Sequence, residues 1–211
     1  MNGSVTAQGS RTSRSRRAGP LAFLAVALVL AGAAMILPWW TLSSTSPSGE
    51  TSFAFGLTSL CVRPSGACTA YAPLVAEESA YGAVAGAFAV AFGLASLALI
   101  GGLLAFLLRL GSAKRRPLDR VSGSAGLAAA IAALAAPLYL FAALPSAFAA
   151  SGLPYGSPIA GFFGGVSGSG ITVSWGGSLG WGVSLAAFAF LLLASVPSAL
   201  RRRAATPSPS P

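Results

Sequence analysis

Four long apolar stretches, none containing a charged residue, dominate this sequence. They run over about residues 18–40, 79–108, 121–150 and 175–197. About 30 Å of hydrocarbon, crossed at a rise of about 1.5 Å per residue, requires a helix of roughly 20 apolar residues. Each stretch reaches that length, so the sequence predicts an all-α membrane protein in which four transmembrane helices form a bundle.

No charged residue separates the third stretch from the fourth. Pro145, Pro154, Pro158 and the glycine-rich run GFFGGVSGSG at 161–170 nevertheless cannot belong to one continuous helix. We therefore expect the chain to leave the membrane between these two stretches and to form a second loop over residues 151–174.

The basic residues fall into three clusters: Arg11, Arg14, Arg16 and Arg17; Arg109, Lys114, Arg115, Arg116 and Arg120; and Arg201, Arg202 and Arg203. These clusters precede the first stretch, separate the second from the third, and follow the fourth. Lys and Arg of short loops are retained on the cytoplasmic side. The pattern therefore predicts a cell-membrane protein with both termini in the cytoplasm and with residues 41–78 and 151–174 outside. The two loops predicted to lie outside the cytoplasm contain only four charged residues: Arg63, Glu50, Glu77 and Glu78.

The first stretch has an alternative interpretation as a cleaved signal peptide, because an Arg-rich start and small residues at Ala31 and Ala33 are typical of one. The apolar run, however, continues into Trp39 and Trp40, which we interpret as an aromatic anchor at the outer membrane interface. A membrane domain of residues 18–200 is predicted between a basic cytoplasmic tail at 1–17 and a Pro-rich cytoplasmic tail at 201–211. Residues 1–17 and 204–211 are expected to be disordered.

Composition argues against several classes of function. The chain has 8% charged residues, no His and only four acidic residues, which leaves almost nothing for paired-carboxylate or His-based catalysis. We therefore expect no enzyme activity, cofactor or metal site. The basic residues are clustered around the spans rather than mixed with aromatic residues on one surface, so we also expect no nucleic-acid binding.

The first outer loop has the pattern of a small folded unit. Pro47-Ser48-Gly49 and Pro64-Ser65-Gly66 are turn signals. Large residues alternate with small ones over 51–57, and 60–63 and 68–71 flank the second turn. The pattern predicts a strand followed by a hairpin, that is, a small β-sheet outside the membrane.

The only two cysteines of the chain, Cys61 and Cys68, lie on opposite arms of this hairpin. Such placement brings the two Cα atoms within disulfide range, about 4.4–6.8 Å. The predicted compartment is also one in which disulfides persist. A disulfide is the favoured interpretation; free structural cysteines or a redox-active pair are the alternatives, and a zinc site lacks ligands.

The second outer loop carries two features of interest. Its glycine-rich run at 161–170 lacks the Lys-Ser/Thr of a phosphate-binding loop, so we expect a flexible or tightly turned loop there. The β-branched run 171–175 could add a strand to the first loop's sheet. Phe162 and Phe163 are expected either to pack on that sheet or to be offered to a partner.

Three glycines of the second stretch, Gly82, Gly86 and Gly93, share a helix face at spacings of four and seven residues. Such a smooth stripe allows the backbone of a neighbouring helix to approach closely, so we expect close packing here, against another span or a second copy. The alternative is that Gly is simply frequent, with 26 in the chain.

Several motifs resemble those of the claudin-like tetraspan superfamily, which includes claudins and the peripheral-myelin and epithelial-membrane proteins. Trp39 or Trp40 matches the family's Trp after the first span, and Gly56-Leu57 begins its Gly-Leu-Trp motif, with Cys61 at the expected distance. Thr58 replaces the motif's second Trp. Gly177-Ser178-Leu179-Gly180-Trp181 resembles the start of the family's fourth helix, and Pro137 falls where the family's third helix often bends.

The resemblance implies a four-helix bundle carrying a small sheet made by the two outer loops. It suggests a non-catalytic protein whose disulfide-pinned outer loop contacts envelope or cell-surface proteins, possibly a second copy of itself, while the helices contact the lipid bilayer. The alternative is a small transporter or channel, or an accessory subunit of a membrane complex. The absence of charge within every span counts against an ion path.

Overall fold

The computed structural model describes residues 6–111, 116–151 and 159–203. Several residues used in the predictions lie outside these ranges: Lys114, Arg115, Pro154, Pro158 and the tail residues 1–5 and 204–211.

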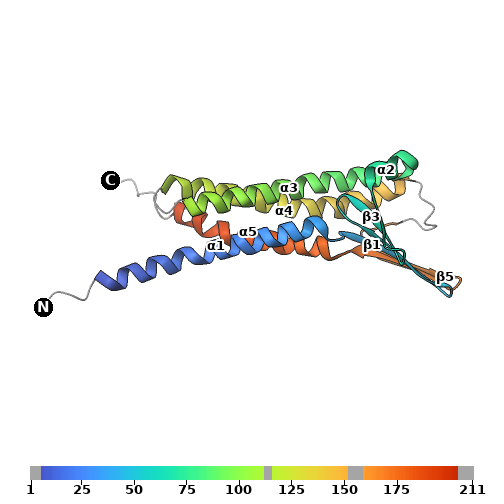
Figure 1. Ribbon diagram of the computed structural model, residues 1–211, viewed down its shortest axis with the longest axis horizontal. Coiled ribbons are helices and arrows are strands. Elements are labelled where there is room, and N and C mark those ends of the chain that lie inside the picture. Colours follow the sequence, from blue (N-terminus) through green and yellow to red (C-terminus); the bar gives the residue numbers. More distant parts are fainter. Residues whose placement is uncertain (1–5, 112–115, 152–158, 204–211) are drawn as a thin grey trace.

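Four long helices form one elongated bundle (Figure 1). They are α1 (Thr6–Ile36), α3 (Gly82–Gly111), α4 (Arg116–Ser151) and α5 (Leu179–Arg203). Each supplies a segment long and apolar enough to cross a membrane: Gly19–Ile36, Ser79–Gly111, Arg120–Ser151 and Leu179–Val196. The prediction of four candidate spans is confirmed.

The helices contact one another in the ring order α1, α3, α4, α5 and back to α1. The start of α1, the end of α3, the start of α4 and the end of α5 lie at one end of the bundle, and a β-sheet lies at the other (Figure 1). The three basic clusters belong to the first end: they fall in the N-terminal half of α1, around the connection from α3 to α4, and at the C-terminal end of α5. The fold therefore separates the Arg-rich end from the sheet end by the full length of the helices.

Two predicted span boundaries are wrong at the sheet end. Helix α1 ends at Ile36 rather than at residue 40, because Pro38 disfavours helical backbone at the residue before it. Helix α5 begins at Leu179 rather than at residue 175, because residues up to Gly177 belong to the sheet.

The predicted disorder of residues 1–17 is also wrong in part, because helix α1 already begins at Thr6. Once an apolar span has nucleated a helix, each further turn adds hydrogen bonds without a second nucleation cost. Polar residues without a core to bury can therefore still extend a helix that the membrane domain supports.

The buried side of α3 follows a seven-residue repeat built mainly from small residues. Its two rows are Val84, Ala91, Ala98 and Ala105, and Phe88, Ala95 and Gly102. Small side chains let the neighbouring helices come close: a Cβ built on Gly101 would lie 3.1 Å from the Cβ of Ala129 in α4. Such van der Waals contact drives helix association where the surrounding lipid is as apolar as the protein.

We expected the stripe of Gly82, Gly86 and Gly93 to pack closely against a neighbouring helix. For the other spans of this chain, that prediction is wrong. A Cβ on Gly86 or Gly93 would meet nothing within 4 Å, and one on Gly82 would meet only Val75 Cγ1 of a short neighbouring helix, at 3.9 Å. Gly86 and Gly93 each follow a residue of the buried rows by two positions, which is about 200° around a helix with 3.6 residues per turn. They therefore face away from the other spans.

The sheet has six strands, and each neighbouring pair is antiparallel. The strands are β1 (Trp40–Ser46), β2 (Gly49–Phe55), β3 (Ser59–Arg63), β4 (Ala67–Ala70), β5 (Gly164–Gly168) and β6 (Ile171–Gly177). Their order across the sheet is β4-β3-β2-β1-β6-β5. The pairing of β1 with β6 joins residues 41–78 to the second loop, as the possible strand over 171–175 suggested.

Two strands and one short helix of the structure were not predicted from the sequence. β1 is rich in Ser and Thr, and β5 lies inside the run 161–170 for which we expected a loop. The two-residue turn after β5 has positive φ at both Ser169 and Gly170, the geometry that matches the twist of a tight hairpin. A short helix, α2 (Tyr71–Glu77), and a 3₁₀ turn, η1 (Ser79–Tyr81), connect the sheet to α3.

The close packing of the bundle predicts different outcomes for two glycines. A Cβ on Gly126 of α4 would lie 2.5 Å from Ser195 Oγ of α5, whereas one on Gly93 has open space. We expect Gly126→Leu to destabilise the bundle by about 1–3 kcal/mol through overpacking. Gly93→Leu should leave the melting temperature of the detergent-solubilised protein almost unchanged. Equal loss in both variants would contradict the packing described here.

Candidate functional site

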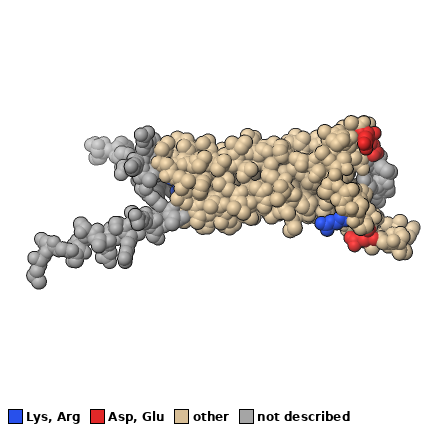
Figure 2. Space-filling view, viewed as in Figure 1, with Lys and Arg blue, Asp and Glu red and all other residues tan. Residues whose placement is uncertain are grey.

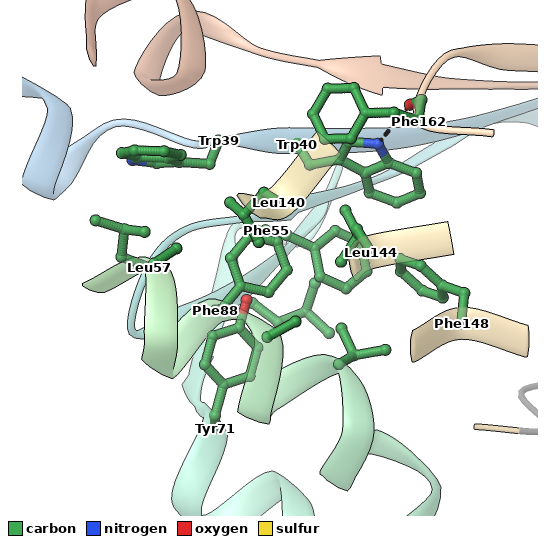
Figure 3. Close-up of a cluster of buried hydrophobic side chains, with 14 of the residues drawn as sticks. Trp39, Trp40, Phe55, Leu57, Tyr71, Phe88, Leu140, Leu144, Phe148 and Phe162 are labelled. Atoms are coloured by element: carbon green, nitrogen blue, oxygen red, sulfur yellow. Dashed lines mark hydrogen bonds between the residues drawn. The ribbon is translucent and has the colours of Figure 1, made fainter. Parts of the chain in front are cut away.

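Trp39 and Trp40 form the joint between the helices and the sheet. Both side chains have no exposed surface, and Figure 3 shows them at the start of β1, beside residues of the helices. Trp39 Nε1 donates to the carbonyl oxygen of Ala34 at 2.6 Å, and Trp40 Nε1 donates to that of Phe162 at 2.9 Å. The prediction of an interfacial aromatic anchor is therefore wrong: both indoles are buried inside the protein.

Trp40 and Phe55 belong to one cluster of aromatic rings to which β1, β2, α2, α3 and α4 each contribute (Figure 3). The centroid of Trp40 lies 5.3 Å from that of Phe55 in β2 and 4.8 Å from that of Phe148 in α4. Phe55 lies 5.9 Å from Phe88 in α3, which in turn lies 5.6 Å from Tyr71 in α2. Such contacts each contribute about 0.5–1.5 kcal/mol beyond burial of apolar area. They fix the sheet to the turns of α3 and α4 that lie nearest to it.

Gly180 and Trp181 hold the start of α5 against this joint. The backbone N–H of Gly180 donates to Pro38 O at 2.7 Å, and a Cβ on Gly180 would lie 2.6 Å from Trp39 Cδ1. Trp181 Nε1 donates to Pro137 O of α4 at 3.0 Å, using a carbonyl near the middle of that helix. The motif residue Trp181 thus bridges α5 and α4.

Gly56 and Leu57 hold the turn between β2 and β3 against α2. Leu57 is buried, and the Tyr71 hydroxyl donates to the Gly56 carbonyl oxygen at 2.9 Å. Burial raises the pKa of Tyr71 above its ordinary value, so the phenol remains a donor. Thr58, which follows, is exposed.

Cys61 and Cys68 are bonded to each other, as the hairpin predicted. They lie directly opposite each other on β3 and β4, with Cα atoms 4.0 Å apart. That separation is shorter than the range expected from sequence, because the two residues face each other in close register. The disulfide ties the outermost strand of one edge to the rest of the sheet.

The two faces of the sheet differ in character. Residues that pair directly across neighbouring strands lie on the same face of the sheet. One face carries these large apolar side chains: Trp40, Leu42, Phe53, Phe55, Leu60, Val62, Val166, Ile171, Val173 and Trp175. The other face carries mainly Ser and Thr, with Arg63 and the disulfide. Alternation of this kind is expected where one face of a sheet is buried.

The apolar face extends beyond the helices that cover it. Leu42 and Phe55 are almost fully buried, whereas Val166 and Ile171 at the far end are 41% and 45% exposed. Figure 1 shows the corresponding hairpin, β5–β6, projecting past the ends of the helices. We call the exposed part of this face, at Val166 and Ile171, the overhang.

Strand β5 forms one edge of the sheet, and all five of its residues are exposed. It contains no charged residue and no Pro, the usual devices that block strand addition at an edge. Because Gly168 and Ile171 close a two-residue hairpin, the backbone groups of Gly165 and Ser167 point away from β6, toward the free edge. This edge can therefore hydrogen-bond to an extended backbone.

The paired aromatics Phe162 and Phe163 have different surroundings. Phe162 is buried, with its ring centroid 5.6 Å from Trp181, and its carbonyl accepts the Trp40 bond. Phe163 is 54% exposed and contacts Phe162 edge-on at 4.9 Å. One ring thus belongs to the joint, and the other lies at the surface beside the sheet.

Charged side chains are absent from most of the described surface (Figure 2). Acidic side chains and one basic group lie at the sheet end, where the described charged residues are Glu50, Arg63, Glu77 and Glu78. Among the described residues, no three His, Cys, Asp or Glu side chains come together as a metal site would require. What the arrangement offers chemically is apolar and hydrogen-bonding surface.

Comparisons with known proteins found no family model that matches this chain and no curated protein with a significant sequence match.

Sequence reasoning found the cysteines, Gly56, Leu57 and Trp181, and it missed Phe162 and Gly180 as parts of the joint. The sequence analysis singled out both Phe162 and the motif that contains Gly180, but it did not place either residue in the joint. The role of Gly180 comes from the close approach of residues 37–39 to the start of α5.

The joint predicts opposite effects for the same substitution at two positions of α5. A Cβ on Gly180 would lie under 3 Å from Trp39 Cδ1 and from the carbonyl oxygens of Leu37 and Pro38, whereas one on Gly182 meets nothing within 4 Å. We expect Gly180→Ala to destabilise the joint by about 1–3 kcal/mol. Gly182→Ala should be neutral or stabilising by up to about 1 kcal/mol through helix propensity.

Thermal unfolding in detergent, followed by limited proteolysis of the sheet, measures both effects. A variant Gly180→Ala that melts with the wild type and resists protease equally would contradict the geometry of the joint.

Proposed function

We propose that this chain is a non-catalytic membrane tetraspan, a divergent relative of the claudin-like superfamily, whose sheet binds another protein outside the cytoplasm. The partner is a protein of the cell envelope or of another cell surface, or a second copy of the chain. Support for the relationship comes from the motif residues themselves: Trp40, Gly56 and Leu57 pack in the sheet or its joint, and Cys61 and Cys68 are bonded.

The proposed orientation places both termini in the cytoplasm and the sheet outside. It is supported by charge, since 12 of the 13 basic residues belong to the clusters that flank the Arg-rich end of the bundle. Because Lys and Arg of short loops are retained in the cytoplasm, we assign the Arg-rich end to the cytoplasmic side of the membrane. A disulfide at the opposite end fits an oxidising compartment there.

The overhang is the observation that carries the proposal of a protein contact. Val166 and Ile171 expose apolar surface beyond the helices, next to an uncharged strand edge that pairs with no other described strand. Apolar surface that projects from a membrane domain into water is stabilised when a partner covers it. The edge backbone of Gly165 and Ser167 supplies hydrogen bonds that an extended segment of the partner can accept or donate.

A transporter or channel is less well supported. The buried hydroxyls inside the bundle are Ser side chains that already donate to backbone carbonyls, as Ser122 does to Ala105 and Ser184 does to Ala133. In the described part of the chain, no buried side-chain nitrogen or oxygen lacks a hydrogen-bond partner. Polar groups that line a solute path are usually left available to the solute.

In-cell photocrosslinking tests the contact. A photoreactive amino acid at Val166 should give one discrete protein adduct in intact cells, identified by mass spectrometry after purification under denaturing conditions. Adding Ile171→Asp should remove this adduct by placing a charge in the overhang, while membrane insertion remains normal because Ile171 is surface-exposed.

The matched control is the same photoreactive residue at Leu104, an exposed apolar position of α3 within the span. Absence of any protein adduct at Val166, or the same set of adducts from Val166 and Leu104, would overturn the proposed contact.

A further inference from the structure

A groove of about 520 Å³ lies between α3 and the elements that connect it to the sheet. One wall comes from Leu57 and from Tyr71 and Val75 of α2, and the floor comes from α3 at Gly82, Gly86 and Phe92. Figure 3 shows Leu57 and Tyr71 beside the outer turns of α3. The groove is distinct from the overhang, which belongs to β5 and β6.

The glycines of α3 create this hollow. Gly86 has no atom within 4 Å of the position of a Cβ, and Gly82 has only Val75 Cγ1, at 3.9 Å. A larger residue at either position would extend into the groove. The stripe of glycines that faces away from the other spans thus forms the floor of a cavity under α2.

The groove is almost entirely apolar. Its two side-chain hydroxyls belong to Thr58 and Tyr71, and the Tyr71 hydroxyl is already bonded to the Gly56 carbonyl oxygen. No charged side chain lines it. An occupant therefore needs hydrocarbon rather than hydrogen-bonding groups, because buried polar atoms without partners cost free energy.

The groove opens onto the lipid-facing surface of α3. Its floor lies in the candidate span Ser79–Gly111, toward the sheet end. Further along the same face, at helical spacing from Phe92, the exposed apolar side chains of Ile100, Leu103 and Leu107 continue the surface. A chain lying along this face of the helix can therefore enter the groove without leaving the hydrocarbon.

The length and lining of the groove fit a hydrocarbon chain. From Gly82 to Phe92 the helix rises about 15 Å, so the groove runs along about three turns of α3. An acyl chain of the bilayer can lie along this length in contact with apolar side chains only.

We propose that the groove binds one acyl chain of a phospholipid from the leaflet nearest the sheet. The chain fills the space above Gly82 and Gly86 and lies against Val75, which places the lipid headgroup beside α2. The bound lipid thereby supports the short helix that links the sheet to α3. This proposal is independent of the protein contact made by the overhang.

Photolabelling in a defined bilayer tests the proposal. The full chain is reconstituted in phosphatidylcholine vesicles that contain a small fraction of phosphatidylcholine with a diazirine on one acyl chain. After irradiation, adducts are located by mass spectrometry. We expect α2 and the outer turns of α3 to be labelled several-fold more strongly than the lipid-facing surface at Ile100 and Leu103.

Two leucine substitutions distinguish the groove from general lipid contact. Gly86→Leu fills the groove and should lower labelling of α2 several-fold, whereas Gly93→Leu, one heptad further along the same helix, should not. Both positions have open space for a side chain, so both variants should fold. Unchanged labelling of α2 in Gly86→Leu, or uniform labelling along α3 in the wild type, would overturn the proposal.

A second measurement excludes a second copy as the occupant. Both native cysteines are consumed by the disulfide, so Gly86→Cys introduces the only free thiol. Under mild oxidation in the same vesicles we expect this variant to remain monomeric. Efficient formation of a disulfide-linked dimer would show that another protein chain, rather than lipid, lies in the groove.

Discussion

Burial of the Trp39–Trp40 pair is the interaction on which the rest of the structure depends. Pro38 ends the first span, and the next two residues place their indoles inside the protein with both N–H groups hydrogen-bonded to backbone carbonyls. Strand β1 therefore begins directly at the end of the helix bundle that carries the sheet. Because β1 pairs with both β2 and β6, this strand fixes the position of the first loop and of the second.

The same joint explains why part of the apolar face of the sheet is exposed. Its apolar face is longer than the helix ends that cover it, so the part near Trp40 is buried and the part near Val166 is not. A rigid attachment at one end keeps the exposed end in a defined position relative to the membrane. Pre-organised surfaces of this kind lose less conformational entropy when a partner binds.

Much of this architecture could be predicted from sequence, because the length of an uncharged apolar stretch alone shows whether it can form a membrane-spanning helix. Turn residues and the spacing of Cys61 and Cys68 likewise indicated the hairpin and its disulfide. β1 and β5 were missed, since a Ser/Thr-rich strand and a Gly-rich strand have no apolar period and depend on the partners they find in the sheet. The buried face of α3 was also missed, because Ala and Gly occur on all sides of that helix and give little contrast.

The central claim is that the sheet lies outside the cytoplasm and that both ends of the chain lie inside. Single cysteines introduced at Ser48, Gly168, Ser13 and Ser208, treated with a membrane-impermeant maleimide on intact cells, test it most directly, because Cys61 and Cys68 are already bonded. The account predicts labelling at Ser48 and Gly168, and labelling at Ser13 and Ser208 only after permeabilisation. Labelling of Ser208→Cys from outside, or labelling of Gly168→Cys only after permeabilisation, would contradict it.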